Sequence, residues 1–140
     1  MVILMLGILS ATAIPKFFEK DVFAEHAFFS DTLNAIRYAQ KLAVTTGCNV
    51  QVSISSNSYT LIRQGISTST TCSGSAYNLD IPHPSSGTNN YSGSEKNVTL
   101  TSTVSPFYFY PLGTASDDVT LTINGVKTIH VIKETGLVYE

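Results

Sequence analysis

The sequence has few charged residues. Lys, Arg, Asp and Glu make up 13% of its 140 residues, and the formal net charge is −2. A protein that binds nucleic acid or anionic lipid through charge needs a surplus of Lys and Arg, so this composition argues against both partners. Ser, Thr, Asn and Gly are abundant instead, as is common in β-rich exported proteins.

Catalytic and metal-binding motifs are also missing. No serine lies in a G-x-S-x-G motif, and no glycine-rich phosphate loop occurs. His26, His83 and His130 lack metal-ligand spacing. Asp117 and Asp118 are adjacent, so in a strand they would point to opposite sides and could not form an acid/base pair. We therefore expect a protein that is not an enzyme and that uses no cofactor, metal or small-molecule substrate.

Cysteine is scarce, with only Cys48 and Cys72, both in polar, turn-rich surroundings. An even number of cysteines in a chain with a membrane or export signal favours a disulfide, and the alternative is two unrelated free thiols. Closing a loop of this size would stabilise the fold by roughly 3–4 kcal/mol.

A long apolar start is the chain's most distinctive feature. Residues 1–14 carry no charge and are apolar on every side, whereas residues 16–46 are amphipathic. This pattern predicts one helix over residues 1–46. Its first part would enter lipid or the interior of an assembly, and its second part would pack on a globular domain. The apolar stripe of the second part comprises Phe29, Leu33, Ile36, Ala39 and Ala43, and Gly47 ends the helix.

The apolar part is short for a membrane span. Residues 1–14 would extend roughly 21 Å as a helix, against ~30 Å for a bilayer core. One alternative is a secretory signal peptide, because Ala11-Thr12-Ala13 resembles a cleavage site, although no basic residue precedes the apolar run. The other is a buried core helix. Gly7 and Pro15 weaken the helix, and we expect a kink or local melting at Pro15.

Residues 47–140 are predicted to form a β-rich head. Strands at 50–54 and 59–63 form a hairpin through a turn at 55–58. Residues 65–94 form a long irregular excursion, with one short strand near 77–81. Further strands are expected at 98–101, 107–110, 119–123, 128–132 and 137–139, with turns at Asn124-Gly125 and Thr135-Gly136.

Two features of the head are candidates for binding. In a strand, Tyr108 and Tyr110 share the face opposite Phe107 and Phe109. The tyrosines are either half-exposed neighbours of a phenylalanine core or part of a subunit contact. His83 lies between two prolines in the long excursion and could join a binding loop.

The N-terminal run MVILMLGILSATAIPKFF resembles the first helix of type IV pilins and pseudopilins, including the spacing of Gly7 and Pro15. Members of that superfamily begin with a methylated Phe and a Thr-Leu-Ile-Glu-Leu block, preceded by the Gly-Phe junction that prepilin peptidase cuts. Neither is present here, so we expect that the chain is truncated or that its start is misassigned. In the family, the Glu of that block pairs with a neighbour's N-terminal amine during assembly, and nothing in residues 1–15 replaces it.

The C-terminal third resembles the GspH/FimT subgroup of minor pilins and pseudopilins. The resemblance rests on Phe109-Tyr110-Pro111-Leu112-Gly113-Thr114, on the hairpin that follows, and on a closing strand that starts near Gly136. Within the subgroup, the chain most resembles minor pilins of mannose-sensitive haemagglutinin pili. Some relatives bind DNA through a basic C-terminal strand. Here the closing strand carries only Glu140, with Lys127 and Lys133 nearby, so we expect no nucleic-acid binding.

The resemblance implies an α+β, pilin-like fold in which a long N-terminal helix packs on antiparallel β-sheet. It implies a non-catalytic minor subunit that is stored in the bacterial inner membrane with its head in the periplasm. The subunit would then be assembled into or at the tip of a type IV pilus-like filament, extracellular or periplasmic. Its partners would be other pilin subunits and the inner-membrane assembly machinery. The residues expected in the membrane or filament core are Met1, Val2, Ile3, Leu4, Met5, Leu6, Gly7, Ile8, Leu9, Ile14 and Pro15. Alternatives are a type II secretion pseudopilin and a pilus-associated receptor or adhesin that uses residues 65–94.

Overall fold

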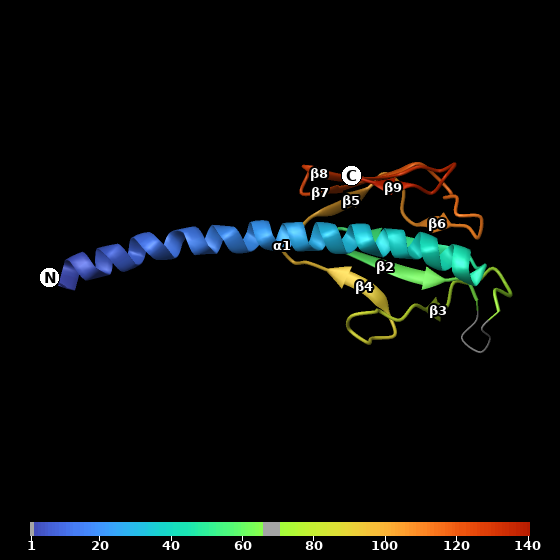
Figure 1. The fold of residues 1–140 in the computed structure, drawn as a ribbon, viewed down its shortest axis with the longest axis horizontal. Coiled ribbons are helices and arrows are strands. Elements are labelled where there is room, and N and C mark those ends of the chain that lie inside the picture. Colours follow the sequence, from blue (N-terminus) through green and yellow to red (C-terminus); the bar gives the residue numbers. More distant parts are fainter. Residues whose placement is uncertain (1, 66–70) are drawn as a thin grey trace.

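The computed structural model describes residues 2–65 and 71–140, with side chains from Lys20 onward. One long helix, α1 (Val2–Thr46), lies against two antiparallel β-sheets. Figure 1 shows the first half of α1 projecting away from the β domain and the second half lying across it. The expected α+β, pilin-like fold is confirmed.

A kink or local melting was expected at Pro15; helix α1 continues through Gly7 and Pro15 without interruption, so the local melting is wrong. A proline removes one backbone hydrogen bond, which a helix of this length tolerates, and Figure 1 shows a gently curved rod. The helix ends as predicted at Gly47, whose φ of 68° is in the left-handed region. The Gly47 amide donates to the Ala43 carbonyl at 3.0 Å.

The second half of α1 buries one side against the sheets. All members of the predicted stripe are buried, namely Phe29, Leu33, Ile36, Ala39 and Ala43. Thr32 is also buried, and its hydroxyl donates to the Phe28 carbonyl at 2.8 Å, so its polar atom is satisfied. The alanines on this side let the helix backbone approach the strands closely.

The first sheet contains β1 (Val50–Ser55), β2 (Ser58–Arg63), β3 (Leu79–Asp80), β4 (Tyr91–Ser94) and β6 (Phe107–Phe109). Its order is β3-β2-β1-β6, and β4 also pairs with β2. The predicted β1–β2 hairpin is confirmed, as is a short strand within residues 77–81. Strand β4 was not expected, because Gly93 interrupts any alternating apolar pattern. Gly93 pairs with Tyr59, whose ring covers the space where a Cβ would stand.

The second sheet contains β5 (Leu100–Ser102), β7 (Val119–Ile123), β8 (Lys127–Val131) and β9 (Val138–Tyr139), in the order β5-β7-β8-β9. Asn124 and Gly125 have φ values of 51° and 70°, and the Val126 amide donates to the Ile123 carbonyl at 3.1 Å. This is the tight turn that the Asn-Gly pair predicts. Strand β5 begins at Leu100 rather than at residue 98.

The core lies between α1 and the inner faces of both sheets. Its fully buried side chains include Ile36, Val50, Leu61, Phe107, Phe109, Leu121 and Ile129. Burial of each such side chain stabilises the fold by about 1.5–3 kcal/mol before the loss of chain entropy is counted. The expected disulfide is present and joins Cys48, just after α1, to Cys72, with a Cα–Cα distance of 5.3 Å.

Candidate interaction surfaces

One side of α1 meets the first sheet through aromatic rings. The Phe28 ring centroid lies 6.1 Å from that of Tyr59, and Tyr38 stacks on Tyr91 at 5.2 Å. The Tyr59 hydroxyl donates to the Asp31 carboxylate. Burial foremost, and then the hydrogen bond to Asp31, raise the pKa of Tyr59; burial and the nearby Asp31 charge also raise the pKa of Tyr91. We name this contact the aromatic seam.

The other side of α1 meets the second sheet through polar side chains. At the point where the helix leaves the head, Glu25 accepts a hydrogen bond from the Asn124 amide at 2.8 Å. The Lys127 ammonium lies 3.7 Å from the Glu25 carboxylate and 5.5 Å from the Phe29 ring centroid. These contacts tie the β7–β8 turn to the helix. We name this contact the polar seam.

Farther along the polar seam, α1 contacts the loop that contains Gly113 and the turn between β8 and β9. The Gln40 side-chain amide donates to the Gly113 carbonyl at 2.9 Å and to the Thr135 carbonyl at 3.2 Å. Gly136 has a φ of 64°, and a Cβ there would overlap the Gly113 carbonyl. Close backbone contact therefore requires glycine at position 136, whereas Gly113 is favoured by its φ of 87° and has only ordinary contacts around it. Their spacing could be seen in the sequence, but the role of Gln40 was missed because nothing in its helical pattern distinguishes it.

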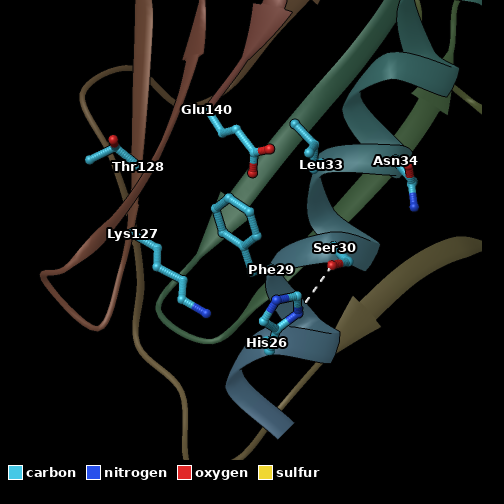
Figure 2. A pocket seen from close by; sticks show the side chains of 8 residues that line it. All are labelled: His26, Phe29, Ser30, Leu33, Asn34, Lys127, Thr128 and Glu140. Carbon is cyan, nitrogen blue, oxygen red and sulfur yellow. Dashed lines mark hydrogen bonds between the residues drawn. The ribbon is translucent and has the colours of Figure 1, made fainter. Parts of the chain in front are cut away.

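Between these polar contacts lies a groove of about 530 Å³, bounded by α1 on one side and β8 on the other. Figure 2 shows the residues that line it: His26, Phe29, Ser30, Leu33, Asn34, Lys127, Thr128 and Glu140. The buried Phe29 and Leu33 give the groove an apolar floor, and its rims are polar. The Glu140 carboxylate reaches into it near Phe29 (Figure 2). Its volume lies in the range of small-molecule sites, and the sequence did not predict it.

The expected interface candidates are Tyr108, which lies in β6 of the first sheet, and Tyr110, which follows this strand. Phe107 and Phe109 are fully buried, Tyr108 is half-buried with its ring centroid 5.1 Å from that of Tyr77, and Tyr110 is exposed. The phenylalanine core face is thus confirmed. A subunit contact through the tyrosines stays a prediction.

His83 is part of the internal structure of its loop. Its ring centroid lies 4.5 Å from that of Tyr91, and its Nδ1 atom accepts the amides of Ser85 at 3.1 Å and Ser86 at 3.3 Å. These contacts fold the loop against β4. A role for His83 in binding a partner stays a prediction.

Exposed apolar side chains gather at two places. Val22 and Phe23 lie just before Glu25 on α1, and Val126 lies in the turn that Glu25 contacts. At the C-terminal end of α1, Val44 is exposed near Gly113, and Leu112 in the same loop is 92% exposed. Scattered apolar side chains are common on soluble surfaces, so these positions alone do not define a site.

The candidate membrane residues, from Val2 to Pro15, lie in the helical backbone of α1, and their side chains fall outside the described set, as does Met1 altogether. Among the residues that the structure describes, no helix is both long and apolar enough to cross a membrane. Within the same residues, no three His, Cys, Asp or Glu side chains are grouped so that they could hold a metal ion.

Comparison with known proteins gives one family. The family model of the type II transport protein GspH matches residues 30–136, which is more than half of the chain. Searches of curated proteins and of solved structures each find no match. The matched range includes most of the buried half of α1, the whole first sheet, strands β5, β7 and β8 of the second sheet, and the Gly113–Gly136 contact; β9 lies just beyond it. The narrower resemblance to pilins of mannose-sensitive haemagglutinin pili stays a prediction. GspH proteins are structural pseudopilins, and this chain belongs to the GspH family.

Proposed function

We propose that the chain is a non-catalytic minor subunit of a type IV pilus-like filament. In this proposal, residues 1–14 hold it in the inner membrane before assembly and lie in the filament core afterwards. The observation that carries the proposal is the continuity of α1 from Val2 to Thr46. Its first half projects from the head, and its second half is fixed to the head by buried side chains (Figure 1).

This division gives the two parts of the chain separate tasks. Residues 1–46 would act as a rod, and residues 47–140 would form the head that the rod displays. Because residues 1–14 carry no charged side chain, they can leave the membrane for a bundle of neighbouring apolar helices without exposing a charge to lipid. The head remains in water in both states, so the second half of α1 needs to pack on one side only.

A charge placed in the rod tests the proposal. In the native bacterium, Leu4→Lys and Ile8→Lys should each reduce membrane association and incorporation into sheared filaments, because a lysine in the hydrocarbon region costs about 2.5–3.5 kcal/mol. Val126→Lys is the matched control, since Val126 is 78% exposed on the head. Membrane fractionation and immunoblotting of filaments give the readouts. Unchanged incorporation of both rod variants would contradict the proposal.

A type II secretion pseudopilus is the second candidate, favoured by the description of the matching family as a type II transport protein. The same rod and head would serve in it. Deleting the gene separates the two: loss of secreted enzymes with normal piliation would identify a secretion pseudopilin, and loss of pili with normal secretion would identify a pilus subunit.

A receptor role for residues 65–94 stays a prediction. Deleting the whole segment would remove β3 and β4, both of which pair with β2, so a binding defect could reflect damage to the sheet. Replacing only the exposed residues 84–90 with Gly and Ser is the sharper variant, because these residues lie between the two strands. Loss of ligand binding with a normal unfolding midpoint would support the receptor role.

A further inference from the structure

Asn124 joins three parts of the molecule through one side chain and its own backbone. Its side-chain nitrogen donates to the Glu25 carboxylate of α1 at 2.8 Å, and its Oδ1 atom accepts the amide of Thr99, just before β5, also at 2.8 Å. The Asn124 backbone amide donates to the Thr99 carbonyl at 2.9 Å. Both ends of the side-chain amide are therefore bound. We name the hydrogen bonds of Asn124 to Glu25 and Thr99 the neck contact.

The residue that follows Asn124 completes the only Asn-Gly pair in the sequence. Both residues are exposed in the β7–β8 turn, and a Cβ on Gly125 would stand in open space. No hydrogen bond from the Gly125 N–H occurs in the described part of the chain. Because glycine has no side chain to hinder approach, its nitrogen is the backbone nucleophile best able to reach the amide carbon of a preceding asparagine.

An Asn-Gly pair can change covalently with water as the only co-reactant. The Gly125 nitrogen attacks Cγ of Asn124 and closes a succinimide ring. The Cγ–Nδ2 bond breaks, and Nδ2 leaves as ammonia with the proton that the Gly125 nitrogen gives up. Water then opens the ring at either carbonyl and leaves aspartate or isoaspartate. The side chain thus loses its N–H donor and gains a carboxylate, and isoaspartate also adds one carbon to the backbone of the turn.

The neck contact opposes this reaction. The ring forms only after the side chain folds back over its own backbone, and a side-chain amide held by Glu25 at one end and by Thr99 at the other cannot do so. The bond to Glu25 is the stronger of the two because its acceptor is charged. The turn is itself closed by the Val126 amide, which donates to the Ile123 carbonyl at 3.1 Å. The reaction therefore requires that the β7–β8 turn first part from α1.

We propose that Asn124 is a deamidation site that the neck contact protects, and that deamidation makes an opening of this contact irreversible. While the contact is closed, Glu25 keeps the amide intact. After the reaction, the new carboxylate faces that of Glu25. Lys127 lies 3.7 Å from Glu25 and supplies one positive charge against these two negative ones. The contact then has like charges where it had a donor and an acceptor, so it does not re-form.

The place of the neck contact gives the reaction a meaning in a filament. Glu25 lies where α1 leaves the head, so a pull on the rod would reach the second sheet at this contact first (Figure 1). Subunits under load would then accumulate isoaspartate at residue 124. This reading rests on the proposed function, whereas the protected deamidation site does not.

The rate of deamidation tests the protection directly. The full chain is incubated in detergent at neutral pH, and peptide mapping by mass spectrometry follows the gain of about 1 Da at Asn124. Glu25→Ala removes the acceptor but keeps the Asn-Gly pair, and it should speed the conversion by about tenfold, as the loss of one charge-assisted hydrogen bond implies. Glu134→Ala removes an exposed carboxylate in the β8–β9 turn and should leave the rate unchanged. Equal rates in Glu25→Ala and the wild type would overturn the proposal.

A second measurement covers the case in which Glu25→Ala lowers the stability of the whole head. The wild type is incubated in urea above its unfolding midpoint, where the neck contact is absent. Its Asn124 should convert at least about tenfold faster than in the folded chain. Gly125→Ala should slow the conversion in urea, because the added methyl group hinders the attacking nitrogen. Equal rates in folded and unfolded wild type would also overturn the proposal.

An exchange of donor and acceptor tests the consequence of the reaction. Asn124→Asp places a carboxylate opposite Glu25 and should raise amide hydrogen exchange at Val126 by about three- to tenfold, measured by NMR in detergent. Adding Glu25→Gln supplies an N–H donor to that carboxylate and should return the exchange close to the wild-type rate. Wild-type exchange in Asn124→Asp, or equally fast exchange in the single and double variants, would contradict the proposed irreversibility.

These assays need no filament, so the proposals can fail separately. A larger isoaspartate fraction is expected in sheared filaments than in subunits extracted from the membrane, and equal fractions would overturn the reading of filament load alone. A chain that shows the protected deamidation but never enters filaments would overturn the proposed function and leave the deamidation site standing.

Discussion

The two seams of α1 differ in kind. Along the aromatic seam, Phe28, Tyr38, Tyr59 and Tyr91 bring rings together, and the one charge that joins them, Asp31, is hydrogen-bonded to Tyr59. Along the polar seam, single side chains such as Glu25, Arg37 and Gln40 reach across to backbone or to the β7–β8 turn. Between the polar side chains of this second seam lies an open groove rather than packed side chains.

The two sides of α1 therefore differ in how much they stabilise the packing of the helix on the head. Buried apolar contacts contribute most of the stability of a helix in a protein, and their loss leaves cavities that cannot relax. Partly exposed polar contacts contribute little each. The predictions below test whether stability resides in the aromatic seam and the core and whether the polar seam mainly sets geometry.

The largest loss of stability is expected from Ile36→Ala. Ile36 is fully buried on the side of α1 that packs on the sheets, and truncating it should lower the free energy of unfolding by about 2–5 kcal/mol because a cavity remains. Urea unfolding followed by circular dichroism measures the loss. Val22→Ala on the exposed surface of the same helix is the control, and it should change stability by less than about 0.5 kcal/mol. Equal losses in the two variants would contradict the buried packing of α1.

A smaller but still marked loss is expected from Gly136→Ala, which should lower the free energy of unfolding by roughly 2–3 kcal/mol. The alanine would have to adopt a φ of 64°, and its Cβ would overlap the Gly113 carbonyl beside Gln40. Gly125→Ala is matched to it, because Gly125 also has a positive φ but has open space around it. That variant should lose only about 1 kcal/mol. Similar unfolding midpoints for the two variants would show that the Gly113–Gly136 contact is not tight.

Much of the fold could be predicted from the sequence, because its signals are local. The apolar stripe of α1, the β1–β2 hairpin and the Asn124-Gly125 turn each follow from residue spacing. Strand β4 could not be predicted, because it is held by Tyr59 packing over Gly93, a contact between distant residues. The groove was missed for a similar reason. The groove depends on how α1, β8 and the end of β9 come together, and no pattern within any one of these elements shows it.

Tyrosine ionisation should weaken the aromatic seam. Burial and Asp31 raise the pKa of Tyr59 in the folded state, so an unfolded tyrosine, with a pKa near 10, loses its proton first. The stabilising effect is complete below about pH 10 and is lost as the pH rises further toward the folded value. We expect stability to fall between about pH 10 and about pH 11, and to fall less steeply in Tyr59→Phe. The raised pKa of Tyr91 accounts for part of the remaining fall.

Urea midpoints at several alkaline pH values measure this effect. Val22→Ala is the control, because Val22 is exposed on α1 and carries no titratable group. It should keep the wild-type pH dependence. Equal losses of stability above pH 10 in Tyr59→Phe and in the wild type would contradict the burial of the Tyr59 hydroxyl against Asp31.

The smallest effect is expected from Lys127→Ala in the polar seam. Its ion pair with Glu25 is partly exposed, so the loss should be less than about 1 kcal/mol and should shrink at high salt. Thermal unfolding at low and high salt measures it. Lys133→Ala, which removes an exposed lysine in the turn between β8 and β9 without an ion pair in the described chain, should show no salt-dependent loss. A loss as large as that of Ile36→Ala would remove the contrast between the seams.

Amide hydrogen exchange along α1 tests the central claim most directly, with the chain first in lipid bilayers and then in aqueous buffer. The account predicts slow exchange for residues 28–43 in both media, because the head protects them. It predicts slow exchange for residues 2–14 only in the bilayer. Equally slow exchange of residues 2–14 in buffer would mean that they pack on the head, and this result would contradict the account.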